Sequence, residues 1–358
     1  MATRILVSTT SFLDTPGLHR EKLRETGYTV IPARGPLTEE QLLDIVTDQE
    51  QFDGFLCGED EFSEKVLEAI APRARVISKY GVGLEKVNLE AAKRLGVKVT
   101  NTPRVNHTTV AELTFGLLIS ATRDIPEHNS RVHAARWDRH TGVELAGKTL
   151  GVFGLGRVGR EVVKRALAFD MKVLVYNTNW SHAHSAFVAD MNRIFSDGAF
   201  SEFKPSVTYG DSADEVLKQS DFVTLHINLT KENKAFLDKG KLALCKRGSY
   251  VVNVSRGALV DQHAMADAIR RGHILGYAAD VLDPEPVTPE NPLLNLPGVI
   301  LTPHIASRTF DSVARQGIAA LENIISVLGP SRYGIDSVCA LPKEQSLNAS
   351  SISRSSAA

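Results

Sequence analysis

The chain has 358 residues, and this length favours two domains of about 150 residues each over a single domain. Its formal net charge is −1, and the 23% of residues that are charged mix both signs, which excludes a basic surface for nucleic acid. No apolar run reaches the ~18 residues of a membrane span and no signal-peptide pattern is present, so we expect a cytoplasmic protein without a membrane partner.

The N-terminal third of the chain alternates between strand and helix patterns. Strands are predicted at 4–8, 28–31, 52–57 and 75–78, and helices at 18–26, from 38 onward and at 63–70. The helix from residue 38 begins with a capping-box pattern, Thr38-Glu-Glu-Gln41. This alternation predicts a small α/β domain with a parallel sheet. A long apolar segment at 108–122 contains no proline and is predicted to be a helix that crosses between the domains.

The most informative stretch of the chain is a glycine-rich turn. A strand pattern at 150–153 is followed by Gly154, Gly156 and Gly159 in the order G-x-G-x-x-G, then by a helical pattern and a strand at 172–176. In such a turn the first glycine allows a tight backbone, the second admits a pyrophosphate, and the third allows close packing of helix on strand. The motif alone is weak, but this strand–turn–helix–strand context favours dinucleotide binding over an ordinary turn.

The remaining chain continues the same alternation. Strands are predicted at 222–226, 249–253 and 274–279, with helical stretches between them, and they complete a doubly wound sheet. The last residues, 344–358, are rich in serine and alanine and predict a disordered tail. Cys57, Cys245 and Cys339 are too scattered for a disulfide framework or a metal cluster, so no metal is expected.

Three side chains downstream of the glycine turn can carry chemistry. Arg256 follows the strand at 249–253, and at the carboxyl edge of a sheet its planar guanidinium suits a carboxylate. His304 follows Glu285 along the chain, and a histidine oriented by a carboxylate is the usual donor or acceptor of a proton near neutral pH. Taken singly, each has an ordinary structural explanation, and spacing does not show whether Glu285 and His304 touch.

Six motifs now stand in one order along the chain, and together they resemble the D-isomer-specific 2-hydroxyacid dehydrogenase family, close to its phosphoglycerate dehydrogenase-like branch. They are Lys79–Gly83, Asn106–Leu113, Gly154–Gly159, Val252–Gly257, Asp280–Pro286 and Thr302–Ser307. The resemblance covers about residues 1–330. It implies two doubly wound parallel-sheet α/β domains, with a Rossmann cofactor domain at 103–290 inserted in a flavodoxin-like substrate domain at 1–102 and 291–330. Residues 331–358 are left as a tail.

The resemblance also implies roles for individual residues. Arg256 would anchor and polarise the 2-oxoacid, His304 would donate or accept the proton, and Glu285 would pair with His304. The substrate would meet Lys79, Val82, Gly83, Asn106 and Arg139, where Arg139 either binds a substrate phosphate or anchors a subunit interface. The cofactor would meet Thr109, Gly154, Gly156, Arg157, Val158, Gly159, Asn177, Val254, Ser255, Asp280 and Ser307.

The implied activity is reversible hydride transfer between NAD and C2 of a D-2-hydroxy or 2-oxo acid, in a homodimer and without a metal. Two crossings between the domains would allow them to close over the substrate. A phosphoglycerate-type substrate and glyoxylate or hydroxypyruvate are alternatives within this class. A corepressor-like protein that senses NAD is the alternative from another class.

Two departures from the family pattern concern the cofactor. Asn177 stands where NAD-using members usually carry an acidic residue that binds the ribose. No arginine occurs between Asn177 and Asn192 to bind a 2′-phosphate, so we expect NAD to be used with weak discrimination against NADP. The stretch 178–206 is longer than the usual connection and predicts a long loop with a functional or mobile role.

Overall fold

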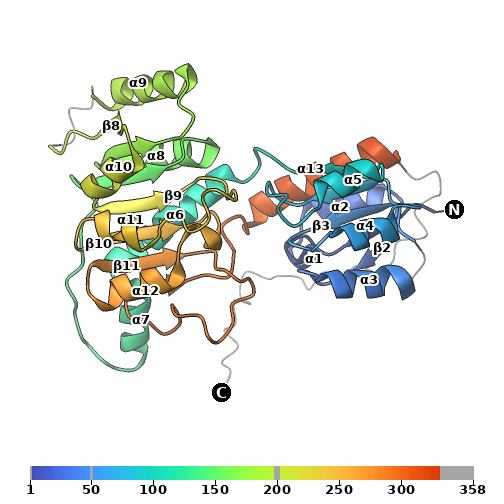
Figure 1. Cartoon of the computed structure of the whole chain (residues 1–358), viewed down its shortest axis with the longest axis horizontal. Coiled ribbons are helices and arrows are strands. Elements are labelled where there is room, and N and C mark those ends of the chain that lie inside the picture. Colours follow the sequence, from blue (N-terminus) through green and yellow to red (C-terminus); the bar gives the residue numbers. More distant parts are fainter. Residues whose placement is uncertain (1, 49–50, 197–201, 331–358) are drawn as a thin grey trace. The chain divides into compact units, whose positions relative to one another are not determined.

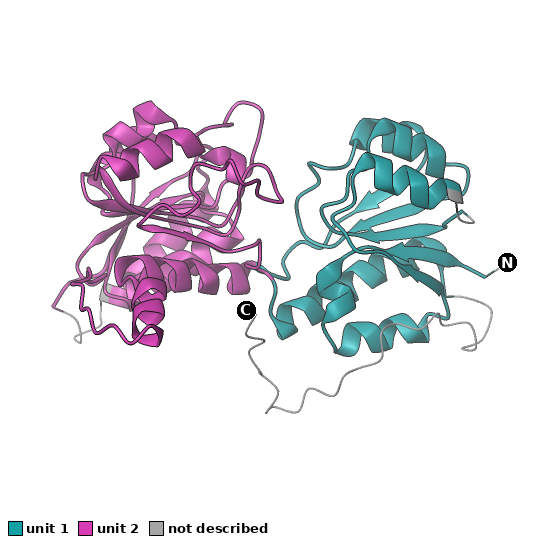
Figure 2. Ribbon diagram, turned by 90° about the horizontal axis from the view of Figure 1, so that it is seen from below, with its two compact units in different colours: residues 1–106, 308–358 teal, residues 107–307 magenta. Residues whose placement is uncertain are grey.

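The computed structural model describes residues 2–48, 51–196 and 202–330. The chain divides into two compact units, one formed by 1–106 with 308–358 and the other by 107–307 (Figure 2). The predicted tail at 331–358 lies outside the described residues, as does Cys339. Among the helices of the described segments, none is long and apolar enough to cross a membrane.

The first unit is a five-stranded parallel sheet covered by helices on both faces (Figure 1). Its strands are β1 (Arg4–Val7), β2 (Thr29–Pro32), β3 (Gly54–Cys57), β4 (Val76–Lys79) and β5 (Lys98–Thr100), in the order β2-β1-β3-β4-β5. One face carries α1 (Thr10–Asp14), α2 (Leu18–Glu25) and α13 (Phe310–Leu328), and the other α3 (Glu39–Asp48), α4 (Glu64–Ile70) and α5 (Leu89–Arg94). Successive residues of β1 point to opposite faces, so Ile5 enters one core and Leu6 the other.

The last helix of the described chain returns to this first unit. In α13, Val313, Leu321 and Ile324 pack into the core beside β1 and β4, and the hydroxyl of Ser78 donates to the carbonyl of Ala320 at 2.9 Å. The second crossing between the units falls after Ser307 rather than at the expected 290/291. The reason is a short strand, β12 (Val299–Leu301), which was not predicted and which pairs with β11 of the second unit.

The second unit is a seven-stranded parallel sheet. Its strands are β6 (Thr149–Phe153), β7 (Lys172–Tyr176), β8 (Ser206–Tyr209), β9 (Phe222–Leu225), β10 (Ser249–Asn253), β11 (Ile274–Ala279) and β12, in the order β12-β11-β10-β9-β6-β7-β8. One face carries α6 (His107–Thr122), α8 (Arg157–Ala168) and α9 (His182–Ser196), and the other α10 (Ala213–Gln219), α11 (Lys239–Leu244) and α12 (Gln262–Arg270). Helix α7 (Ile125–His133) buries none of its residues.

These two strand orders confirm the predicted fold class. The first sheet has the flavodoxin-like order, and the second has the Rossmann order with one more strand at its edge. In the second sheet the order reverses between β6 and β9, so the glycine turn after β6 lies at the topological switch point. Ligands of such sheets bind outside the carboxyl ends of the strands at this point.

The stretch 178–206 differs from the long loop that was expected. Residues 182–196 form α9, which packs on the sheet beside β8. Its apolar residues Phe187, Val188, Met191 and Phe195 contact the same core as α6 and α8. Their spacing places them on one side of a helix, and this amphipathic pattern was missed in the sequence.

Candidate active site

The glycine turn after β6 has one open position between two closed ones. Gly154 has a φ of +101°, and a Cβ on it would lie 2.5 Å from the carbonyl oxygen of His226. A Cβ on Gly159 would lie 1.9 Å from the carbonyl oxygen of Gly154. In contrast, a Cβ on Gly156 would meet no atom within 4 Å. The backbone at Gly156 is therefore accessible to a ligand, while its two neighbours are fixed by packing.

The start of α8 presents the features that a pyrophosphate needs. Gly156 is the N-cap of α8, Arg157 is exposed at the first helical position, and Val158 is half-buried. The first backbone N–H groups of a helix have no partner within the helix and favour an anion. Together with the open backbone at Gly156, this arrangement fits a dinucleotide.

Asn177, the expected ribose contact, holds the glycine turn itself. Its side-chain oxygen accepts a hydrogen bond from the backbone N–H of Leu155 at 3.0 Å. Its side-chain nitrogen donates to the carbonyl of Asn179 at 2.8 Å. The amide therefore links the end of β7 to the turn after β6.

Arg256 is fixed at the carboxyl end of β10 by the preceding loop. The side chain of Asn253 accepts from the backbone N–H of Ser255 at 3.0 Å and donates to the carbonyl of Arg256 at 2.9 Å. The Ser255 hydroxyl donates to the carbonyl of Ile227 at 2.5 Å. Asn253 is fully buried, and the sequence analysis gave it no role. Its two bonds hold the backbone of Arg256 in place.

A glycine brings the loop of Arg256 against the loop that contains Glu285. A Cβ on Gly257 would lie 2.0 Å from the carbonyl carbon of Leu282, so only glycine allows this backbone contact. The backbone N–H of Leu282 in turn donates to Oε1 of Glu285 at 2.9 Å. The segments after β10 and β11 thus form one packed edge of the sheet.

Glu285 and His304 are in direct contact. Oε2 of Glu285 lies 2.7 Å from Nδ1 of His304, and the two side chains are 34% and 36% exposed. His304 has a φ of +53°, a conformation that costs a non-glycine residue about 1 kcal/mol or more. Its backbone N–H donates to the carbonyl of Asp280 at 2.8 Å, which helps to hold this conformation.

Asp280 holds the loop of His304 from beneath. Its carboxylate is 1% exposed and accepts hydrogen bonds from the Thr302 hydroxyl at 2.6 Å and from the backbone of Ile305 and Ala306 at 2.8 and 2.7 Å. Burial raises the pKa of Asp280, and these donors and the nearby His304 partly offset that effect. Asp280 was predicted to lie near the cofactor, and what the structure shows is that it supports the His304 loop.

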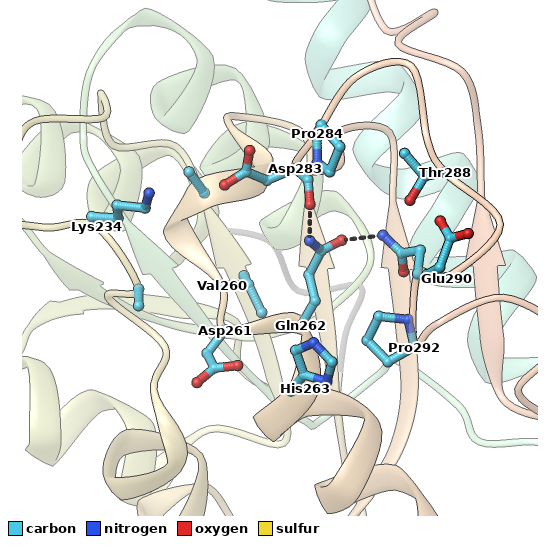
Figure 3. Close-up of a pocket in the computed structure, with 13 residues that line it drawn as sticks. Lys234, Val260, Asp261, Gln262, His263, Asp283, Pro284, Thr288, Glu290 and Pro292 are labelled. Carbon is cyan, nitrogen blue, oxygen red and sulfur yellow. Dashed lines mark hydrogen bonds between the residues drawn. The ribbon is translucent and has the colours of Figure 1, made fainter.

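The Glu285 loop is held by a side chain from α12. Gln262 donates to the carbonyl of Asp283, and its side-chain oxygen accepts from the side chain of Asn291 at 2.9 Å (Figure 3). Both ends of the proline-containing segment around Glu285 are therefore attached to the start of α12. Gln262 was not predicted, because no sequence motif around it indicates a contact with this loop.

The first unit contains four of the predicted substrate residues. Lys79, at the end of β4, has a side chain that is 2% exposed, and its ammonium contacts Oε1 of Glu59 at 2.7 Å and the carbonyl of Gly58. Val82 and Gly83 follow in the loop after β4, and Val82 is 47% exposed. Asn106 ends this part of the unit and is half-buried. A substrate carboxylate at Lys79 would share the ammonium with Glu59.

The remaining predicted residues lie in the second unit. Thr109 on α6 and Val254 after β10 are buried, and Ser307 at the end of the His304 loop is half-buried. Arg139 is exposed on the segment after α7, close in sequence to Trp137, which is 79% exposed. The structure therefore brings Arg256, Glu285 and His304 to one edge of the second sheet, while Arg139 lies on a separate surface segment.

Comparisons with known proteins agree with this geometry. Residues 115–306 match the family model described as D-isomer specific 2-hydroxyacid dehydrogenase, NAD binding domain. The chain is 35% identical to a glyoxylate reductase of Thermofilum pendens over 82% of each chain. It is also 35% identical to a D-3-phosphoglycerate dehydrogenase of Methanocaldococcus jannaschii, over 88% of this chain and 57% of that protein. The crystal structure of the TT0316 protein from Thermus thermophilus is 33% identical, with a TM-score of 0.76 over 92% of this chain and all of that one.

Proposed function

The chain belongs to the D-isomer specific 2-hydroxyacid dehydrogenase family and is an oxidoreductase that acts on CH–OH with NAD(P), and we propose that Arg256, Glu285 and His304 are its catalytic residues. The observation that carries this proposal is the 2.7 Å contact between Glu285 and His304. The loop that contains Glu285 packs against the loop that contains Arg256. In the proposed arrangement the second unit binds the cofactor and the first binds the substrate.

The proposed mechanism assigns one task to each side chain. When bound, the nicotinamide supplies or accepts the hydride at C2 of the acid. His304 gives a proton to the C2 oxygen during reduction and removes it during oxidation, and the carboxylate of Glu285 orients the ring and stabilises its protonated form. The Arg256 guanidinium binds the substrate carboxylate and polarises the carbonyl next to it.

The proposed cofactor contacts follow from the second sheet. Gly154, Gly156, Arg157, Val158 and Gly159 would hold the pyrophosphate at the start of α8. Thr109, Val254, Ser255, Asp280 and Ser307 would lie toward the nicotinamide, and Asn177 toward the ribose. This assignment is supported by the open backbone at Gly156 and by the family match over 115–306.

For the substrate, we propose a phosphoglycerate-type D-2-hydroxy acid, with glyoxylate or hydroxypyruvate as the alternative. The matched proteins carry both kinds of name, a glyoxylate reductase and a phosphoglycerate dehydrogenase. Lys79, Val82, Gly83 and Asn106 would contact the acid, and Arg139 would contact its phosphate. We further propose a homodimer in which the exposed segment after α7 contributes to the interface.

A substrate screen tests this proposal. The purified chain is assayed with glyoxylate, hydroxypyruvate, phosphohydroxypyruvate and pyruvate, each with NADH and with NADPH, and His304→Asn serves as the control for catalysis. We expect the unmodified chain to reduce at least one of these acids, and His304→Asn to lower that activity by roughly 10²–10⁴-fold. Dinucleotide binding without turnover of any acid would reject the enzyme and favour a corepressor-like binding protein.

A further inference from the structure

A positive side chain reaches the end of β7 from the opposite side of the glycine turn. Leu155, in the turn, is bound at both of its backbone polar groups. Its N–H donates to the side chain of Asn177 at 3.0 Å, and its carbonyl accepts from Nε of Arg160 at 3.4 Å. Arg160 lies in the first turn of α8 and Asn177 follows β7, and both side chains bond to the backbone of Leu155.

The guanidinium of Arg160 is held in this position by α9. Its Nη2 donates to the carbonyl of Ala183 at 3.3 Å, and its central carbon lies 5.1 Å from the centre of the Phe187 ring, a cation–π contact. A guanidinium has five N–H groups, and the hydrogen bonds that Arg160 makes within the described residues use two of them. The others can bind an anion.

No negative charge opposes Arg160 along the segment that follows β7. Residues 177–187 contain no aspartate or glutamate. They contain two histidines, and Nδ1 of His184 accepts a hydrogen bond from the backbone N–H of Ser181 at 3.0 Å, which requires this ring nitrogen to be unprotonated. Burial lowers the pKa of His184, and the charge of Arg160 lowers it further. Of His184 and Arg160, only the guanidinium therefore carries a positive charge in this arrangement.

This position decides which dinucleotide a Rossmann domain accepts. An acidic residue at the end of the second strand binds the ribose 2′-hydroxyl of NAD and repels a 2′-phosphate, whereas a nearby arginine accommodates the 2′-phosphate of NADP. Here Asn177 replaces the acid, and the arginine comes from α8 instead of the segment between Asn177 and Asn192. Arg160 lies outside that segment and was therefore not predicted.

We infer that Arg160 is the residue that binds the 2′-phosphate, so that the chain accepts NADP(H) as well as NAD(H). The inference rests on the proposed function only through the dinucleotide site at the glycine turn. Asn177 keeps the end of β7 uncharged, and α9 holds the guanidinium beside it. The longer connection at 178–206 thereby contributes to the choice of cofactor.

The test compares ligands that differ only in the 2′-phosphate. Calorimetry on the full chain measures binding of 2′,5′-ADP against 5′-AMP, and of NADPH against NADH, for the unmodified protein, Arg160→Gln and Arg160→Lys. Lys164→Gln is the matched control, because it removes one positive charge from the same helix at a side chain paired with Glu161. We expect Arg160→Gln to weaken NADPH and 2′,5′-ADP by roughly 10–100-fold, the range for a charge-assisted bond to phosphate, and NADH and 5′-AMP by less than about twofold.

The remaining variants give further outcomes. Arg160→Lys retains the positive charge but not the planar guanidinium, and its NADPH affinity is expected to lie between those of the unmodified protein and Arg160→Gln. Lys164→Gln is expected to change neither the NADPH nor the NADH affinity. Equal losses for NADPH and NADH in Arg160→Gln would show that Arg160 only supports the turn, and would overturn the inference. No preference of the unmodified protein for 2′,5′-ADP over 5′-AMP would also overturn it. These binding results do not depend on turnover, so a failed substrate screen and a failed inference remain distinguishable.

Discussion

His304 follows Glu285 by 19 residues, and Nδ1 of its ring lies 2.7 Å from Oε2 of that carboxylate. The contact is made possible by backbone bonds on both sides. Glu285 is held through the N–H of Leu282, and His304 is held through the carbonyl of Asp280. In the proposed mechanism the other ring nitrogen, Nε2, exchanges the proton with the substrate, since Nδ1 contacts Glu285.

Loss of this pair is expected to slow catalysis without releasing the cofactor. His304→Asn removes the proton donor and is expected to reduce turnover by roughly 10²–10⁴-fold. Titration of NADH fluorescence is the control and is expected to give an affinity close to that of the unmodified protein. Near-normal turnover of the variant would exclude His304 from the mechanism.

Glu285→Gln is expected to change the pH dependence of reduction. In the proposed mechanism reduction requires a protonated His304, so the rate falls as pH rises, and the Glu285 carboxylate would favour that protonated form. Without the negative charge, the fall is expected at lower pH. The measurement is kcat/KM for the 2-oxoacid across pH 5–10, and an unchanged profile would show that the pair has no electrostatic role.

Arg256 and Lys79 are expected to differ in which kinetic constant they change. Arg256 is proposed to bind the carboxylate and to polarise the carbonyl, so Arg256→Ala is expected to lower kcat and to raise KM. Lys79→Met preserves the buried volume but removes the charge, and is expected mainly to raise KM. Because Lys79 also pairs with Glu59, the thermal midpoint of the Lys79→Met variant is measured together with its kinetics. Equal effects of both changes on KM alone would reject the division of roles.

Most of the fold could be predicted because its strands are apolar and bounded by turns. The predicted strands at 172–176, 249–253 and 274–279 coincide with β7, β10 and β11. Short edge strands such as β12 were not predicted, since three residues are too few to show a periodic pattern. Because β12 belongs to the second unit, the second crossing between the units follows Ser307 instead of residue 290.

Residues whose contacts depend on tertiary packing could not be predicted from the sequence. Sequence motifs indicated Arg256, Glu285 and His304, whereas Gln262 and Arg160 are polar residues of predicted helices with no motif that indicates their contacts. Gln262 matters because α12 begins beneath the Glu285 loop, and Arg160 because α8 begins beside the end of β7. Both relationships depend on the packing of neighbouring elements and not on spacing within a motif.

A buried histidine is expected to make the first unit less stable in acid. His19 is fully buried against Phe12, and burial lowers its pKa below the ordinary 6.5. Between the lowered pKa of His19 in the folded chain and about pH 6.5 the unfolded chain binds more protons at this residue than the folded chain does, so stability falls as pH falls through this window, by up to about 1.4 kcal/mol per pH unit. His19→Gln is expected to reduce the slope of the thermal midpoint between pH 7 and 5. The exposed His182 provides the control, and equal slopes in His19→Gln and His182→Gln would reject this effect.

Substitution of Arg139 is expected to distinguish a phosphorylated substrate from a small one. If its guanidinium binds the substrate phosphate, Arg139→Ala is expected to impair phosphohydroxypyruvate much more than glyoxylate or hydroxypyruvate, because only the first carries the group it would pair with. Sedimentation of the variant checks the oligomer. Equal loss on all substrates, or loss of the oligomer, would assign Arg139 and its neighbour Trp137 to an interface and favour a small unphosphorylated acid.

Two glycines of the turn, Gly159 and Gly156, are expected to respond differently to the same added methyl group. Gly159→Ala places a Cβ 1.9 Å from the carbonyl oxygen of Gly154, so α8 must move away from β6, and a large loss of thermal stability is expected. Gly156→Ala meets no protein atom within 4 Å and has an ordinary φ of −73°, so the fold is expected to remain intact. Its methyl group instead occupies the space through which a pyrophosphate would approach, and NADH affinity is expected to fall. A folded Gly156→Ala that binds NADH normally would show that the open backbone is not where the dinucleotide binds, and an unfolded variant would show that the position is not open.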